Sequence, residues 1–309
     1  MPNQPRCSGV FAPVVMPFGK DLSVDARKLI RQCKWLLTQN VGIAVFGTNS
    51  EANSLSVDEK IELLDQLIDA GIDPSRLMPG TGLCALPDTV RLTRHAAESG
   101  CAGALMLPPF YYKGVSDDGL YRSYAEVIER VASDRLKIYL YHIPPISQIA
   151  ISISLIERLI NDFPDTVVGI KDSSGDWNNT KTMLEAGWDD FRIFAGSESF
   201  LLQTMRGGGA GCISATANIN PAAIYDLYSN WQAPNADSKQ QELIVLRELV
   251  QKYPVIPALK SIVAHNSNDP DWLHVRPPLD TLDPSLRDEL LAQLATIDFH
   301  MEGLLEVTL

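Results

Sequence analysis

Short apolar segments rich in β-branched residues alternate along the chain with longer segments of helical hydrophobic period. The candidate strands are 9–17, 42–46, 77–80, 103–107, 137–141, 167–171, 191–195 and 211–214. The candidate helices are 26–38, one that opens at Ser56 with Glu59 completing a capping box, 89–98, 121–132, 154–161, 178–186, 199–205 and 221–230. The strands are continuously apolar instead of alternating, as in a parallel sheet that is covered on its faces. Eight such units in about 230 residues predict an α/β fold, a (β/α)8 TIM barrel.

The pattern changes after Trp231. Residues 232–238 are polar and include Pro234, and after them only helical periods occur, at 240–252, 256–265 and 284–301. We therefore expect a barrel with the active site in residues 1–231, and a C-terminal helical extension packed on it in residues 232–309. A doubly wound sheet is the alternative, but the glycine-rich segment 206–211 is not the dinucleotide-binding G-x-G-x-x-G between a strand and a helix.

Composition and charge narrow the classes of function. The 309 residues include 26 Lys and Arg against 38 Asp and Glu, which gives a formal net charge of −12. Such a surface repels nucleic-acid phosphates and anionic lipid. No stretch approaches the roughly 18 to 20 consecutive apolar residues of a membrane span, and the opening residues lack the apolar core of a signal peptide. We expect a cytoplasmic protein that binds neither nucleic acid nor a membrane.

The cysteines and histidines show no metal-binding or disulfide pattern. The five cysteines are scattered without a C-x-x-C pair, and the five histidines lack the H-E-x-x-H spacing of a zinc site. Metal ligands can also be assembled from distant parts of a chain. From the spacing we expect buried free thiols and no metal site.

Polar residues at the carboxyl ends of the strands are the candidates for chemistry, because the active sites of TIM barrels lie there. Lys171 ends the apolar segment 167–170, where burying a charged ammonium is costly, and a lysine in this place can act as an amine nucleophile. Of the eleven lysines only Lys20, after the first strand, has a comparable position. The alternative role for Lys171 is a structural ion pair with a neighbouring carboxylate.

Two further groups are expected at the same level of the barrel. Tyr141 ends the neighbouring strand, where its phenol can shuttle protons or simply pack in the core. The adjacent His142 points to the opposite face, and we expect it to be structural. Segment 47–51 combines a glycine with hydroxyl, amide and backbone donors, which suit a carboxylate, although a helix-capping turn has the same composition.

Five motifs, in this order, resemble the dihydrodipicolinate synthase/N-acetylneuraminate lyase family of Schiff-base-forming pyruvate aldolases and lyases. The matching runs are Gly47-Thr48-Asn49-Ser50-Glu51, Pro109-Phe110-Tyr111, Tyr141-His142-Ile143-Pro144, Gly169-Ile170-Lys171-Asp172 and Gly211-Cys212-Ile213-Ser214-Ala215-Thr216-Ala217-Asn218. The resemblance extends from Gly9 to the C-terminal helices.

This resemblance implies a carbon–carbon lyase that reversibly cleaves a 4-hydroxy-2-oxo acid or a 2-oxo-3-deoxy sugar acid into pyruvate and an aldehyde, without a cofactor. Lys171 would form an imine with the 2-oxo group. Tyr141, Thr48 and Tyr111 would relay the proton, with Tyr111 lent by a neighbouring subunit of a homotetramer made from tight dimers. The substrate-binding residues that it implies are Gly47, Thr48, Asn49, Ile146, Gly196 and Ile213.

Two departures from the family pattern bear on the substrate. Synthases of the family carry an arginine two residues after the Tyr-x-x-Pro motif, for a carboxylate of the second substrate, and this chain has Ile146 there. The difference favours the lyase and sugar-acid aldolase branches. Asn49 and Ser50 replace a hydroxyl residue and a glycine, which predicts a strained or differently turned backbone at Ser50. Dehydration or dihydrodipicolinate synthesis through the same imine, and a non-catalytic paralogue that binds a 2-oxo acid, are the alternatives.

Overall fold

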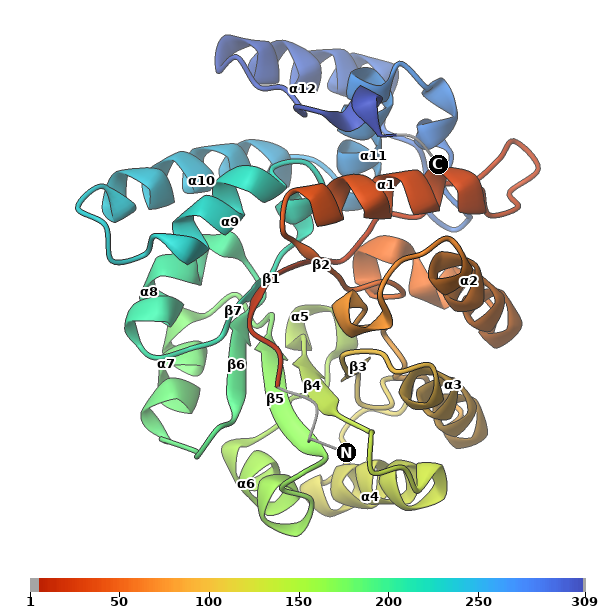
Figure 1. Ribbon diagram of the computed structural model, residues 1–309, viewed down its shortest axis with the longest axis vertical. Coiled ribbons are helices and arrows are strands. Elements are labelled where there is room, and N and C mark those ends of the chain that lie inside the picture. Colours follow the sequence, from red (N-terminus) through yellow and green to blue (C-terminus); the bar gives the residue numbers. More distant parts are fainter. Residues whose placement is uncertain (1–5, 308–309) are drawn as a thin grey trace.

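The computed structural model describes residues 6–307, which form a closed barrel of parallel strands ringed by helices (Figure 1). The strands are β1 (Gly9–Ala12), β2 (Gly42–Ile43), β3 (Ala104–Met106), β4 (Ile138–His142), β5 (Val167–Asp172), β6 (Arg192–Ala195) and β7 (Gly211–Ile213). They pair in parallel in the order β2-β1-β7-β6-β5-β4-β3. The predicted (β/α)8 architecture is confirmed.

The predicted third strand closes the barrel through two isolated bridges and not as a regular strand. Leu77 bridges to Ile43 of β2, and Gly80 bridges to Leu105 of β3, both in parallel. Pro79 accepts a hydrogen bond from Leu105 N at 2.9 Å but has no N–H of its own to donate. This missing donor interrupts the ladder, so the segment joins β2 to β3 without the regular pairing of its neighbours.

The outer helices follow the strands in turn. They are α1 (Ala26–Thr38), α2 (Val57–Asp69), α3 (Leu86–Glu98), α4 (Asp117–Val131), the short α5 (Pro144–Ser147), α6 (Ile153–Asp162), α7 (Trp177–Glu185), α8 (Leu201–Arg206) and α9 (Pro221–Ser229). The capping box is present, since the Ser56 hydroxyl accepts from Glu59 N and the Glu59 carboxylate accepts from Ser56 N. Helix α4 begins before its hydrophobic period because its first turn is polar, and Ser116 caps it by accepting from Gly119 N.

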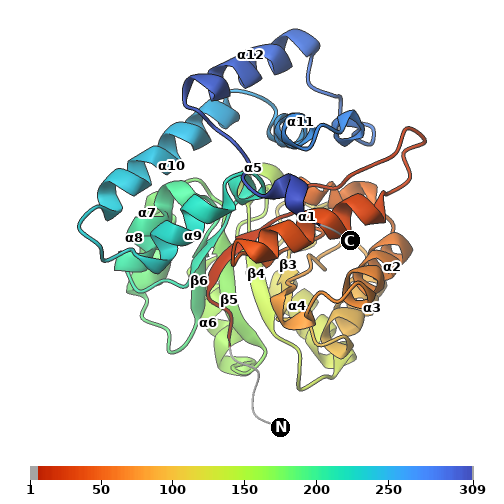
Figure 2. The same cartoon turned by 45° about the horizontal axis from the view of Figure 1, so that its top comes forward.

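The C-terminal helices α10 (Ala236–Gln251), α11 (Val255–Ser267) and α12 (Pro284–Thr296) gather on one side of the barrel, where α10 lies beside α9 and α11 lies near α1 (Figures 1 and 2). Their apolar side chains, such as Leu246 and Ile262, belong to the same buried cluster as Val10 of β1. Helix α10 begins inside the polar segment 232–238. Helix α12 ends before the predicted residue 301 because the chain turns at Asp298, whose φ is +50°.

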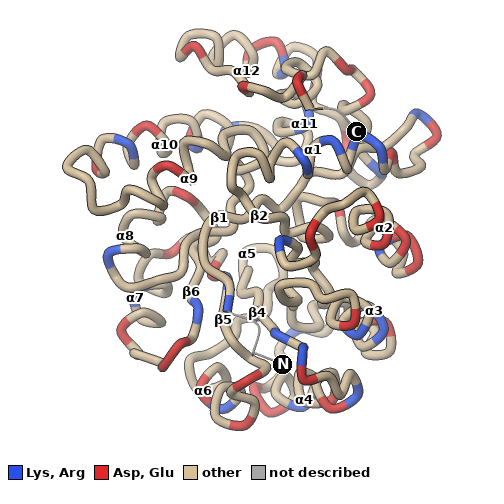
Figure 3. The backbone as a smooth tube through the Cα atoms, in the orientation of Figure 1, with Lys and Arg blue, Asp and Glu red and all other residues tan. Residues whose placement is uncertain are grey.

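The barrel interior is packed with side chains, and the charges lie outside it. The interior residues are Phe11, Ala44, Met78, Leu105, Tyr139, Tyr141, Ile143, Val168, Phe194, Ala210 and Ile213. Lys, Arg, Asp and Glu lie mainly on the outer helices and loops with both signs mixed, and acidic residues are dense along α2 (Figure 3). None of the helices in residues 6–307 has the length and apolarity that a membrane crossing requires. The packed interior forms a floor beneath the carboxyl ends of the strands.

Candidate active site

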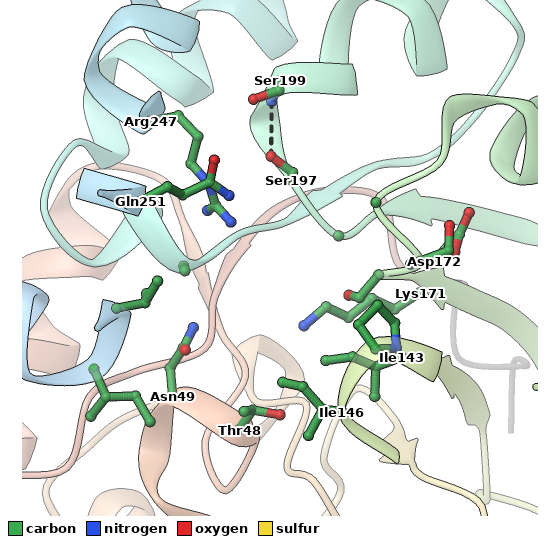
Figure 4. A pocket seen from close by; sticks show the side chains of 18 of the residues that line it. Thr48, Asn49, Ile143, Ile146, Lys171, Asp172, Ser197, Ser199, Arg247 and Gln251 are labelled. Carbon is green, nitrogen blue, oxygen red and sulfur yellow. Dashed lines mark hydrogen bonds between the residues drawn. The ribbon is translucent and has the colours of Figure 1, made fainter. Parts of the chain in front are cut away.

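A cavity of about 600 Å³ opens at the carboxyl ends of the strands (Figure 4). Its walls come from the turn after β2, the ends of β4, β5 and β6, the short helix α5, and the C-terminal helices α10 and α11. The polar and charged side chains in these walls include Thr48, Asn49, Tyr141, Lys171, Asp172, Ser197, Ser199, Arg247 and Gln251. Segments far apart in the sequence therefore meet at this one end of the barrel.

Lys171 reaches the cavity from the end of β5. The residue is 4% exposed, and its Nζ lies 4.2 Å from the centroid of the Tyr141 ring. Within residues 6–307 no carboxylate oxygen lies within 4.0 Å of this Nζ, so the structural ion pair considered for Lys171 is not formed. Lys20 is exposed in a turn after β1 and does not line the cavity. The structure thus leaves Lys171 as the amine that faces the cavity from a strand end.

Asp172, the next residue, uses its carboxylate to hold the segment that follows β5. Its Oδ2 accepts from Thr180 Oγ1 at 2.6 Å, and its Oδ1 accepts from Ser174 N at 2.9 Å. Gly196 N donates to the Asp172 carbonyl at 2.6 Å, where β6 ends beside β5. A Cβ at Gly196 would lie 2.1 Å from Ser173 Oγ, so this cavity wall requires a glycine.

The pairing of β4 and β5 brings Tyr141 beside Lys171, because these two residues are partners in the register. Gly169 makes room for this arrangement, since a Cβ there would lie 2.6 Å from Cδ1 of the Tyr139 ring below. The Tyr141 hydroxyl lies 3.2 Å from Thr48 Oγ1, a hydrogen bond in which either oxygen can donate. An amine, a phenol and a hydroxyl are therefore adjacent, and the last two can pass a proton between them.

The turn after β2 is a single turn of 3-10 helix, Thr48–Ser50. Ser50 is fully buried, and its hydroxyl donates to the carbonyl of Val14. The strain predicted at Ser50 falls instead on Glu51, whose φ is +51°. Gly47 precedes the turn and does not line the cavity. Ser50 therefore fits where the family pattern has a glycine, with its hydroxyl turned into the protein and bonded to the Val14 carbonyl.

Glu51 anchors this turn to α11 and to the segment after it. Its buried carboxylate accepts from Lys260 Nζ at 2.6 Å and from Arg276 N at 2.9 Å. Burial lowers the pKa of Lys260 to about 8, and the Glu51 carboxylate opposes this shift by favouring the charged amine. A helix of the C-terminal part therefore holds the turn that carries Thr48 and Asn49.

Besides Gly47, two more residues of the predicted site, Tyr111 and Ile213, do not line the cavity, whereas Ile146 does. Tyr111 is 74% exposed on the loop after β3, with its ring 5.4 Å from that of Tyr112. Ile213 is buried in the barrel interior. Ile146 of α5 lines the cavity and is 62% exposed. A single chain thus brings Lys171 and Ile146 to one cavity and leaves Tyr111 on the surface.

Arg247 and Gln251 of α10 also line the cavity, although the sequence pattern did not single them out (Figure 4). With its amide oxygen turned toward the arginine, Gln251 accepts from Arg247 Nε at 2.9 Å and from Nη2 at 3.0 Å. A signal was available in the sequence. Arg247 falls between Leu243 and Val250 on the buried stripe of α10, where a charged residue is unexpected.

Glu198, which follows β6, contacts Arg247 without lining the cavity itself. The residue is 1% exposed, and its carboxylate accepts from the hydroxyls of Ser214 and Thr216. Arg247 Nη1 lies 3.5 Å from Glu198 Oε2 and donates to Ser214 Oγ at 3.3 Å. The hydroxyl residues of run 211–218 thus orient a carboxylate that in turn orients the arginine.

His142 lies on the outer side of β4, as expected of a structural residue. Its Nδ1 accepts from Ile151 N at 3.0 Å, which assigns the ring proton to Nε2 in the neutral form. Burial lowers the pKa of His142, and the Asp172 carboxylate opposes part of this shift. The neutral imidazole therefore ties β4 to the segment before α6.

The described residues hold no group of three or more His, Cys, Asp or Glu side chains placed to bind a metal ion. All five cysteines are free thiols. Cys33, Cys101 and Cys212 are buried as expected, Cys7 is only partly buried, and Cys84 is exposed on the segment before α3. The expectation of uniformly buried thiols is therefore wrong for Cys84.

Comparison with known proteins supports the motif resemblance. The model of the dihydrodipicolinate synthetase family matches residues 6–297. An uncharacterized DapA-like lyase from Chloroflexus aurantiacus is 30% identical over 305 residues, which cover 97% of this chain and 98% of the relative.

Solved structures agree. Dihydrodipicolinate synthase from Agrobacterium tumefaciens matches with a TM-score of 0.86 and 31% identity, over 93% of this chain and 98% of that one. A prophage protein of the dihydrodipicolinic acid synthase family from E. coli, crystallised in complex with pyruvate, has the same fold, with a TM-score of 0.85 and 24% identity over 94% and 99% of the two chains. The chain therefore belongs to the dihydrodipicolinate synthetase family and is an enzyme of the lyase type.

Proposed function

We propose that the enzyme forms an imine between Lys171 and a 2-oxo acid, and that it reversibly cleaves a 4-hydroxy-2-oxo acid or a 2-oxo-3-deoxy sugar acid into pyruvate and an aldehyde. One observation carries the proposal: Lys171 faces a cavity with its Nζ against the Tyr141 ring and with no carboxylate partner in residues 6–307. An amine that faces a cavity and is not engaged by a carboxylate is placed to attack the 2-oxo carbon of a bound acid. The E. coli protein of the same fold was crystallised with pyruvate, which supports a 2-oxo acid ligand.

The chemistry follows from the positions of three groups. The Lys171 amine attacks the 2-oxo carbon, and loss of water leaves a protonated imine. The hydroxyl on C4 then gives up its proton, the C3–C4 bond breaks, and its electron pair moves into the imine to form an enamine while the aldehyde leaves. Protonation of the enamine at C3 and hydrolysis release pyruvate and the free lysine. Tyr141 accepts and returns the proton, and its bond to Thr48 gives the proton a path.

The substrate carboxylate, in this proposal, binds the turn after β2. Thr48 and Asn49 line the cavity there and offer hydroxyl, amide and backbone donors. Such donors, held in place before the substrate arrives, stabilise an anion without an arginine. The buried Glu51 and Lys260 pair keeps the turn in position.

The assembled enzyme, we propose, is a homotetramer of tight dimers in which Tyr111 enters the site of a neighbouring subunit. The exposure of Tyr111 beside Tyr112 supports this role, because monomers rarely leave adjacent large aromatic residues in water. Lys113 Nζ donates to the Ser147 carbonyl at 2.7 Å and so ties the aromatic loop to α5 at the cavity rim.

Borohydride trapping tests the proposal. In the presence of pyruvate, borohydride should add a pyruvate-derived mass to the peptide that contains Lys171 and abolish activity. Lys171→Ala should abolish both the labelling and the activity, and Lys20→Ala should leave both as in the wild type. Label on Lys20, or an unmodified Lys171 peptide, would contradict the assignment. Trapping without turnover of any 2-oxo acid would instead identify a non-catalytic binding protein.

Product analysis separates cleavage from the other reactions of the imine. A screen of 4-hydroxy-2-oxo acids and 2-oxo-3-deoxy sugar acids should release pyruvate and an aldehyde in equal amounts. Formation of a dehydrated acid without pyruvate would show that the same imine serves dehydration.

A further inference from the structure

Two cationic side chains line the cavity, and the proposed reaction uses one of them. Lys171 points into the cavity from β5, and the Arg247 guanidinium points toward its centre from α10 (Figure 4). No other lysine or arginine in the described part of the chain lines this space. The Arg247 side chain is 11% exposed, so this cation is largely removed from water, and it lines the cavity.

The hydrogen bonds of Arg247 leave part of the guanidinium available to a ligand. A guanidinium has five N–H donors. Gln251 accepts from Nε and from Nη2, and Ser214 accepts from Nη1, so three donors are engaged with the described residues. One N–H remains on each terminal nitrogen. Two donors on one planar group are what a carboxylate requires for a paired contact with both of its oxygens.

Glu198 keeps this arginine in place without closing the site. Its carboxylate is already bonded to two hydroxyls, and the Arg247 contact of 3.5 Å is longer than the roughly 2.7 to 2.9 Å of a strong charged hydrogen bond. Since Glu198 is 1% exposed and does not line the cavity, a ligand meets the cation first. Removing a guanidinium from water while leaving donors open favours an anionic partner.

We propose that Arg247, positioned by Gln251 and Glu198, binds a carboxylate at the end of the substrate far from the imine. The inference rests on the proposed function and makes its substrate a 2-oxo acid with a second terminal carboxylate. A phosphate would carry nearly two charges to a single arginine that already faces Glu198, so a carboxylate fits better. The carbon bonded to this carboxylate carries no ammonium in the proposed substrate, because that cation would lie near the guanidinium. Ile146 lies on a different part of the wall and takes no part in this contact.

Matched pairs of 2-oxo acids that form the imine but cannot be cleaved test the proposal. We would measure how 2-oxoglutarate and 2-oxopentanoate, and separately 2-oxoadipate and 2-oxohexanoate, compete with pyruvate for borohydride trapping at Lys171. Each pair differs only in a terminal carboxylate or methyl group. In at least one pair the diacid should bind about tenfold tighter or more, as expected for a charged pair in a largely buried site.

Variants of Arg247 then assign the preference to this side chain. Arg247→Gln should remove the preference for the diacid, measured as the ratio of binding within each pair, so that an equal effect on both members cancels. Arg247→Lys keeps a cation beside Glu198 and should retain a smaller preference. Arg206→Gln, which removes a surface arginine paired with Asp237 outside the cavity, is the matched control and should behave like the wild type.

Two outcomes would overturn the inference: equal binding within both pairs by the wild-type enzyme, or a diacid preference that survives in Arg247→Gln. If Arg247→Gln fails to fold because Glu198 loses its cation, the wild-type pairs and Arg247→Lys decide. A failure of the proposed function looks different, since pyruvate itself would then not be trapped at Lys171.

Discussion

At the scale of single residues, the hydroxyl group of Tyr141 distinguishes a role in proton transfer from a role in packing alone. Tyr141→Phe keeps the ring beside Lys171 and removes only the group bonded to Thr48. Turnover should fall by roughly 10²-fold or more, with the free energy of unfolding nearly unchanged. Steady-state kinetics and urea denaturation measure the two effects.

Tyr139→Phe is the matched control for this experiment. Tyr139 lies deeper in the same barrel, and its hydroxyl accepts from Cys7 N at 2.6 Å, away from the cavity. Its removal should cost stability of about 1 kcal/mol and leave turnover intact. Near-normal turnover in Tyr141→Phe would place that tyrosine in the core and require another proton carrier.

Ile146 is expected to disfavour aldehydes that place a carboxylate against its side chain. A substrate carboxylate placed against this apolar side chain would lose water without gaining a charged partner. Condensation of pyruvate with aspartate semialdehyde should therefore be poor, and Ile146→Arg should raise it. Consumption of the two substrates measures the rate. Rapid condensation by the wild-type enzyme would assign it to the synthase branch.

The imine also predicts how the reaction responds to chelators. It serves as the electron sink that a divalent ion supplies in other aldolases, so the reaction requires no metal ion or organic cofactor in our proposal. Activity should survive dialysis against EDTA. A complete loss that zinc or magnesium restores would rule out this mechanism.

At the scale of secondary-structure elements, the buried pair of Glu51 and Lys260 joins the turn after β2 to α11. Lys260→Met would leave a buried carboxylate without its cation, which typically costs about 3 to 5 kcal/mol of stability. The Michaelis constant for pyruvate should rise as the turn loosens. Urea denaturation and steady-state kinetics check both effects, and the double variant Lys260→Met with Glu51→Leu should recover much of the lost stability. Full stability in Lys260→Met alone would show that the pair contributes little.

His142 makes the junction of β4 and α6 sensitive to acid. Its folded-state pKa lies below the ordinary value of about 6.5, because burial disfavours the imidazolium. Below that pH the unfolded chain binds a proton that the folded chain does not, so stability falls as the pH falls. The slope from this one group is at most about 1.4 kcal/mol per pH unit. Between about pH 7 and pH 5, the free energy of unfolding should therefore fall less steeply with pH in His142→Asn than in the wild type. Urea denaturation at each pH measures it.

At the scale of the whole molecule, the site we propose is completed by a second subunit. Co-expression of Tyr111→Phe and Lys171→Ala chains tests this directly. In a mixed dimer one site would combine an intact Lys171 with an intact partner tyrosine, so activity should return to about a quarter of the wild-type value when subunits pair at random. If Tyr111 acted within its own chain, every mixed site would carry a defect and no activity would return.

The packing of the C-terminal helices is a further property of the whole molecule. Residues of α10 and α11 share a buried cluster with β1, and they supply one wall of the cavity. Periodicity correctly predicted helices here, but it did not show where they lie on the barrel. Helix positions depend on which apolar faces meet, and many pairings of such faces satisfy the same local pattern.

The sequence by itself determined the barrel and the meeting of Lys171 with Tyr141. Continuous apolar strands are a local pattern, and parallel strands bring all their carboxyl ends to one edge, so the residues that end neighbouring strands must lie together. Only the tertiary structure decided that Arg247 joins them, because α10 reaches the cavity through contacts between segments far apart in the chain. It also decided that the buried Lys260 supports the turn of Thr48, since the position of a charge within a helix does not reveal which carboxylate it will meet.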